Sequence, residues 1–325
     1  MIGWVARSWA KTGERLPHAL RLETAGIYIA LLVVLVMAGM LSPSFYQPAN
    51  IFNVLRQASA LGILSVGQTF VLLGGGIDLS VAAVMQLATV GVAELARGQN
   101  ERVLIAVAVM LALSAMVGAV NGLLVTRRRV APFVATLFVG VVVSGIRLAY
   151  TEAAPSGSLP PAIRFLGRDS TGPVPNATLI FLGLALLAAL VLRKSSFGRR
   201  LYATGGKDRA ARLSGVPVEK VRLMTYMLCS LLAGFAGLVL AGYIGYADQW
   251  IGRGYDLDSI AAVVIGGTSF AGGRGGIAGT VAGVLLVTVL LNLVLLLNLN
   301  VQWQLVVKGM VIIIAVALHS VRRRD

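Results

Sequence analysis

Charged residues are scarce in this chain of 325 residues: they make up 13% of it, against about 25% in an average soluble domain. Hydrophobic residues make up 57% and are grouped into runs such as 26–41, 103–125 and 280–297, each about as long as a bilayer-spanning helix. A soluble chain of this size would instead show alternating amphipathic patterns around one core. The composition therefore predicts an all-α polytopic membrane protein.

Cysteine and histidine are almost absent. The single cysteine, Cys229, lies in an apolar run and can form no disulfide within the chain. The two histidines, His18 and His319, lie near opposite ends of the sequence, and neither has a metal-ligand partner nearby. No Ser/His/Asp or Cys/His set marks a nucleophile. The sequence therefore predicts no metal site and no catalytic residue, and it argues against an intramembrane enzyme.

A phosphate-binding loop is also missing. The GK pair nearest a glycine run is Gly206-Lys207, which is followed by Asp208 rather than Ser or Thr. The residue five before Gly206 is Leu201, where the loop pattern requires glycine. The chain is therefore predicted to hydrolyse no ATP and to hold no cofactor, so the energy for its work must come from a partner.

The net charge of +15 has two interpretations. Basic proteins often bind nucleic acid, but Lys and Arg also mark the cytoplasmic side of membrane proteins. With the N-terminus inside, most of the 28 Lys and Arg residues fall on cytoplasmic segments. The charge therefore predicts no nucleic-acid partner, two cytoplasmic termini and an even number of spans.

The apolar runs predict about ten transmembrane helices, of which the second and eighth are short and end in glycines. The first run is interpreted as a retained span rather than a signal peptide. We expect a cytoplasmic segment over 1–24, one transmembrane domain over 25–321 with an outer loop at 152–176 and a cytoplasmic segment at 194–222, and a cytoplasmic tail over 322–325. The ten spans cover residues 25–41, 58–73, 79–96, 103–125, 132–151, 177–193, 223–245, 258–271, 278–297 and 302–320.

Two glycine-rich breaks interrupt the runs, at residues 74–80 and 265–276. Irregular backbone inside a membrane must be buried in protein or line water, and polar groups at such breaks border solute pathways in transporters. Close packing through small residues is the alternative. Asp78 also suits the N-cap of the next helix, a role that is compatible with a position beside a solute pathway. The predicted pathway residues are Gln68, Thr69, Asp78, Ser80, Gln86, Thr268, Ser269 and Phe270.

The cytoplasmic segment is basic and contains a predicted short helix at 207–213, with Gly215 as its stop and Pro217 beyond. A solvated loop, or one that binds anionic lipid, would suit its charge. Its apolar insertions favour a helix that docks into a partner's groove instead. These insertions are Leu201, Tyr202, Ala210, Ala211, Leu213 and Val216.

From about residue 45 to its C-terminus, the sequence resembles the permease subunits of ribose-type ATP-binding cassette (ABC) sugar importers. The resemblance rests on residues 74–80 (GGGIDLS), 197–215 (FGRRLYATGGKDRAARLSG) and 256–276 (DLDSIAAVVIGGTSFAGGRGG). The last two motifs are long and specific. The superfamily also includes permeases for branched-chain amino acids and nucleosides.

The resemblance implies a permease pair, either a homodimer or two close paralogues, around a central pathway in the bacterial inner membrane. It implies a separate ATPase subunit that carries ATP and Mg, and a periplasmic binding protein that delivers a monosaccharide or a related small polar solute. The helix that couples the permease to the ATPase would lie in the segment where many members have Asn-Glu-Ala-Ala and this chain has Lys-Asp-Arg-Ala. The implied coupling residues are Gly206, Lys207, Asp208, Ala210, Ala211, Arg212, Leu213, Ser214 and Gly215.

Two alternative functions stay open. A self-sufficient channel or secondary transporter would use intramembrane charges such as Asp78 for ion coupling. An ABC permease for a nucleoside or an amino acid would share the same architecture and differ in its solute.

Overall fold

The structure is a computed structural model that describes residues 18–152, 154, 158–300, 302–303, 305–306 and 309–310, with side chains from residue 26 onward. Residues 1–17 of the predicted N-terminal segment lie outside the described residues. So do the predicted tail 322–325 and most of the predicted span 302–320.

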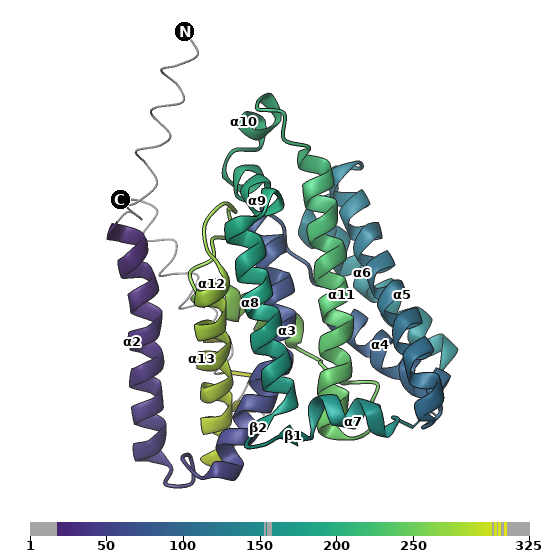
Figure 1. Ribbon diagram of the computed structural model, residues 1–325, viewed down its shortest axis with the longest axis vertical. Helices are drawn as coiled ribbons and strands as arrows, with labels where there is room; N and C mark the ends of the chain where they lie inside the picture. The colour runs from purple at the N-terminus through teal and green to yellow at the C-terminus, as the bar shows by residue number, and fades with distance from the viewer. Residues whose placement is uncertain are drawn as a thin grey trace.

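The described chain is a bundle of long helices, and its one sheet is a hairpin of two-residue strands (Figure 1). The elements in order are α2 (His18–Leu41), α3 (Pro48–Leu73), α4 (Val81–Ala96), α5 (Asn100–Thr126), α6 (Pro132–Tyr150), α7 (Pro161–Gly167), β1 (Ser170–Thr171), β2 (Val174–Pro175), α8 (Asn176–Lys194), α9 (Ser196–Gly206), α10 (Asp208–Leu213), α11 (Val218–Ile244), α12 (Tyr255–Ile265) and α13 (Ile277–Leu296).

Five of these helices, α5, α6, α8, α11 and α13, are long and apolar enough to cross a membrane, and Gly26–Leu41 and Val81–Ala96 are shorter apolar helices. The predicted all-α membrane protein is therefore confirmed. The count of about ten spans stays a prediction.

The expectation that the second span is short is wrong. α3 begins at Pro48 and has 26 residues, whereas α4, which follows the first break, has 16. A count of apolar residues misses the first turns of α3 because they carry polar side chains with partners in other elements. The Asn50 and Asn292 amides exchange hydrogen bonds at 3.1 and 2.9 Å, and Arg56 donates to Ser170 Oγ at 3.2 Å. The eighth span is short as expected, since α12 has 11 residues.

α11 is the central helix of the bundle and packs against α3, α4, α5 and α7. Glycines bring the helix backbones close together. A Cβ at Gly67 of α3 would lie 2.9 Å from the Cα of Cys229, and one at Gly237 of α11 would lie 2.9 Å from the Cα of Met85. Helices in lipid associate through such close contacts because lipid and apolar side chains are equally apolar.

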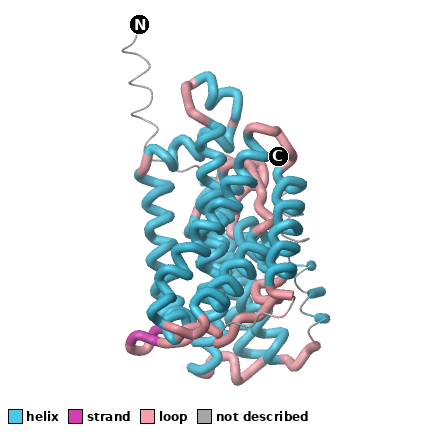
Figure 2. Tube along the Cα trace, turned by 90° about the vertical axis from the view of Figure 1, so that its right-hand side faces the viewer, coloured by secondary structure: helices cyan, strands magenta, loops and turns pink. Residues whose placement is uncertain are grey.

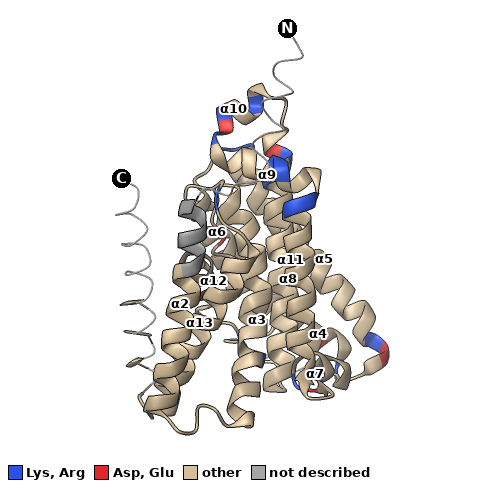
Figure 3. Cartoon of the chain, turned by 60° about the vertical axis from the view of Figure 1, so that its left-hand side comes forward, with Lys and Arg blue, Asp and Glu red and all other residues tan. Residues whose placement is uncertain are grey.

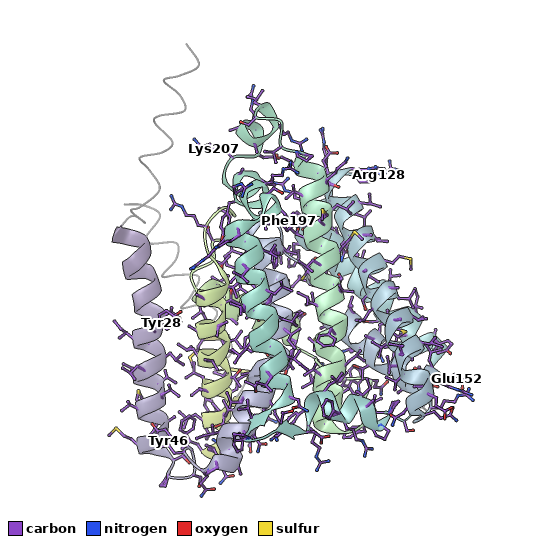
Figure 4. All side chains as sticks on the ribbon, viewed as in Figure 1. Tyr28, Tyr46, Arg128, Glu152, Phe197 and Lys207 are labelled. Atoms are coloured by element: carbon purple, nitrogen blue, oxygen red, sulfur yellow. The ribbon has the colours of Figure 1, made fainter. Side chains whose placement is uncertain are left out.

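The two ends of the bundle differ in shape and charge. α9 and α10 cover one end, here named the capped end, where Lys and Arg gather (Figure 3). α7 and the β1–β2 hairpin cover the opposite end, here named the hairpin end (Figures 1 and 2). Arg128 and Lys207 lie toward the capped end, and Tyr46 and Glu152 toward the hairpin end (Figure 4).

Candidate functional site

The two glycine breaks meet at the capped end. Gly273 of the second break donates its backbone N–H to the Leu73 carbonyl oxygen, the last of α3, at 3.0 Å. A Cβ at Gly272 would lie 2.9 Å from the backbone nitrogen of Gly75, and Gly272 has a φ of 81°, which favours glycine. The breaks predicted separately from the sequence are therefore one contact site in the fold.

α9 rests on both breaks. A Cβ at Gly205 would overlap the Leu73 carbonyl oxygen, and one at Gly273 would lie 2.7 Å from the Cα of Gly206. The Tyr202 hydroxyl donates to the Gly275 carbonyl oxygen at 2.9 Å, and burial raises the pKa of this hydroxyl, which keeps it a neutral donor. We name this three-way contact the glycine hub; it comprises residues 73–75, 205–206 and 272–275.

α10 continues from α9 and carries the predicted coupling residues. The predicted helix at 207–213 is present as Asp208–Leu213, after Gly206 and Lys207 and before Ser214 and Gly215, whose φ is 77°. Ala211 packs inward, whereas the Leu213 side chain is 84% exposed. At this exposure the Leu213 side chain is accessible to a partner. The coupling role of these residues stays a prediction.

Asp208 and Arg212 belong to an ion network at the base of α10. Asp208 accepts from Arg212 Nε at 3.1 Å, and Arg212 Nη1 donates to Glu219 at 3.2 Å. The hydrogen bond to Glu219 and the Asp208 carboxylate raise the pKa of Arg212, so its guanidinium stays charged. Ion pairs as exposed as these contribute little stability, because solvent screens them. The network therefore matters for the orientation of α10 rather than for stability.

Arg222 connects this network to the first break, and sequence reasoning missed it. Its Nη1 donates to Asp208 Oδ2 at 3.4 Å, and its Nε donates to the Gly74 carbonyl oxygen at 3.0 Å. In the sequence, Arg222 is one of many basic residues and lies 148 residues from Gly74. The one signal that could have found it is its position at the junction of the basic segment with the next span.

Asp78 lies beyond the hub and organises the start of α4. Its Oδ1 accepts from the Ser80 backbone N–H at 2.9 Å and the Ser80 hydroxyl at 2.6 Å, and its Oδ2 accepts from Ser230 of α11 at 3.4 Å. Asn121 of α5 donates to Ser80 Oγ at 2.8 Å. The N-cap position belongs to Ser80, so the predicted N-cap role of Asp78 is wrong. Asp78 instead closes a turn before the helix and ties the break to α5 and α11.

The other predicted pathway residues divide into three places. Thr69 of α3 shares a hydrogen bond of 2.8 Å with Thr280 of α13, and the Gln68 amide oxygen accepts from the Cys229 thiol at 3.4 Å. Thr268, Ser269 and Phe270 lie in the second break, where Phe270 packs against Leu72 and α12. Gln86 lies apart from the others on α4. That these residues line a pathway stays a prediction.

The described residues contain no group of three or more His, Cys, Asp or Glu side chains that suits a metal ion. The arrangement at the capped end is therefore one of backbone contacts, hydrogen bonds and ion pairs. What it can do is transmit a displacement of α9 and α10 to both breaks.

Residues 50–316 match the family described as branched-chain amino acid transport system / permease component. The ribose import permease protein RbsC of Escherichia coli (strain K12) is 41% identical over 299 residues, which cover 90% of this chain and 92% of that protein. RbsC of Bacillus subtilis (strain 168) is 40% identical, with 91% and 92% covered. The galactose/methyl galactoside import permease protein MglC of E. coli (strain K12) is 32% identical over 319 residues, with 93% and 95% covered. No solved structure matches.

Proposed function

Because this chain belongs to the family of branched-chain amino acid transport system permease components, we propose that it is the membrane-spanning permease subunit of an ABC importer. Its solute is a monosaccharide or a related small polar molecule, delivered by a periplasmic binding protein. Relatives named as import permeases for ribose and for galactose support a sugar. The chain is a transport subunit, and ATP and Mg bind to a separate ATPase.

The capped end faces the cytoplasm in this proposal. Lys and Arg gather there, and positively charged segments favour the cytoplasmic side of a membrane. The hairpin end then faces the periplasm, where the binding protein delivers its solute. The protein resides in the bacterial inner membrane with both termini in the cytoplasm, and a second permease subunit, identical or a close paralogue, completes the pathway.

The glycine hub is the observation that carries the coupling mechanism. α10 docks on the ATPase, and closure of the ATPase around ATP displaces α10 together with α9. Because α9 contacts both breaks at backbone distance, and packed interiors transmit displacement rather than absorb it, the breaks move with it. Asp208 and Arg222 supply a second connection, from α10 to the Gly74 carbonyl.

Reconstitution tests the proposal. Purified chain alone should hydrolyse no ATP. Vesicles that contain the chain, its partner permease if there is one, and the ATPase, with binding protein added on the side of the hairpin end, should accumulate labelled ribose only when ATP is present on the other side. Uptake of ribose in vesicles that lack the ATPase subunit would overturn the proposal in favour of a self-sufficient transporter.

A further inference from the structure

Arg147 of α6 is a buried charge, and two of its donors have no partner in the part of the chain that the structure describes. α6 buries one stripe of residues, Ala135, Thr136, Gly140, Val143 and Arg147, and the arginine side chain in its last turn is only 3% exposed. Its Nη2 donates to Gln86 Oε1 of α4 at 3.3 Å. Its Nε and Nη1 are buried and have no hydrogen-bond partner among the described residues. None of the ion pairs that the described residues form includes Arg147.

The linker between α11 and α12 closes over the same place. The Asp248 carboxylate attracts the Arg147 guanidinium electrostatically. The neighbouring Gln249 also has a buried amide oxygen without a partner among the described residues. Gly252 of this linker packs against α4, where its Cβ would lie 3.0 Å from the Cε of Met85, the residue before Gln86. α6, α4 and the linker therefore meet in this region.

Two guanidinium donors without a partner among the described residues, in a membrane-spanning protein, call for an occupant. An ionised donor that is buried without a partner is costly, and intramembrane arginines usually serve a pathway. With 3% of the residue exposed, neither lipid nor the surface of another protein contacts it in the described conformation. The occupant is therefore small, and it must offer hydrogen-bond acceptors to Arg147 and donors to the oxygens of Gln86, Asp248 and Gln249. Sugar hydroxyls do both.

We propose that Arg147 and Gln86, with the Asp248–Gln249 part of the linker, form a solute-binding position for hydroxylated solutes at the hairpin end of the bundle. This inference rests on the proposed function, which supplies the solute and places this end toward the periplasm. The guanidinium donates two hydrogen bonds to hydroxyl oxygens of the arriving sugar, and the carboxylate and amide oxygens accept from its O–H groups. The position opens when the linker moves away from α4 during turnover.

Thiol labelling tests the position directly, because the native Cys229 is fully buried. In the assembled transporter, Gln86→Cys should react with a small methanethiosulfonate reagent during ATP turnover. Millimolar ribose should slow the reaction by about tenfold, the effect of a hydrogen bond to a charged group. This protection should disappear in an added Arg147→Gln exchange and persist in an added Arg164→Gln exchange, because Arg164 is an exposed arginine at the same end.

Several outcomes would overturn the position. These are a thiol at residue 86 that never reacts during turnover, a reaction that ribose does not slow, and protection that survives Arg147→Gln. If Arg147→Gln prevents assembly, Arg147→Lys replaces it, since lysine keeps the charge and loses the fork of donors. Failure of the proposed function is seen separately, in unmodified transporter that takes up no ribose with ATP.

Discussion

The Arg222 guanidinium holds the first carbonyl group of the first break, because its Nε donates to the Gly74 oxygen at 3.0 Å. Gly74 is the C-cap of α3, where carbonyl groups have no partner within the helix. Arg222 comes from the first turns of α11, which directly follow the α10 segment. A movement of α10 therefore has a direct path to the end of α3.

Arg222→Gln should uncouple ATP hydrolysis from uptake. Glutamine is too short to reach Asp208 and Gly74 together, so α10 loses one of its two connections to the breaks. We expect uptake per ATP hydrolysed to fall by about tenfold, the value of a hydrogen bond to a charged group, while the complex still assembles. The measurement is ribose uptake and phosphate release in the same vesicles.

Lys220→Gln is the matched control, since it removes one positive charge from the same turn of α11 at an exposed position. It should leave the ratio of uptake to hydrolysis unchanged. Equal ratios for Arg222→Gln and Lys220→Gln would contradict the role of Arg222 in coupling.

Gly205→Ala should destabilise the hub within the isolated permease. Its Cβ would overlap the Leu73 carbonyl oxygen, so α9 must move off both breaks, at a cost of about 1–3 kcal/mol. The neighbouring Gly206 has open space at its Cβ position, and Gly206→Ala is therefore the control. Thermal unfolding of the two purified variants in detergent measures the difference. Equal midpoints would show that α9 does not pack on α3 as described.

Asp78→Asn should also destabilise the fold. The carboxylate accepts hydrogen bonds from Ser80, Ser230 and Asn121. The asparagine amide would place an NH₂ donor against one of these donors, which should lower the free energy of unfolding by about 1–3 kcal/mol. Ser230→Ala removes the longest of the serine contacts, 3.4 Å, and should cost less. Unfolding midpoints test this order. Solute uptake by the unmodified chain without its ATPase, lost in an Asp78→Asn protein of native stability, would favour the ion-coupled transporter instead.

Several spans were predictable because a membrane-crossing helix needs a long apolar run, whether lipid or protein surrounds it. The runs at 103–125, 132–151 and 278–297 correspond to α5, α6 and α13 within a few residues. α9 was not predicted because it does not lie in an apolar run. It packs instead against two breaks that are distant from it in the sequence. The contact between Gly205 and Leu73 and the one between Arg222 and Gly74 are long-range, so no local pattern announces them. The glycines indicated irregular backbone, but not which segment they would contact.

Leu213→Asp should weaken binding of the ATPase subunit without affecting the permease fold. The side chain is 84% exposed at the end of α10, so its exchange costs the isolated chain no more than about 0.5 kcal/mol. In a docking groove, however, the change replaces a buried apolar side chain by a charge, which should weaken association by at least about tenfold. Co-purification of the ATPase with tagged permease measures the effect.

Leu213→Met keeps an apolar side chain of similar volume and should retain the ATPase. If Leu213→Asp retains it equally well, α10 does not dock through this residue, and the docking surface must lie on another part of the capped end.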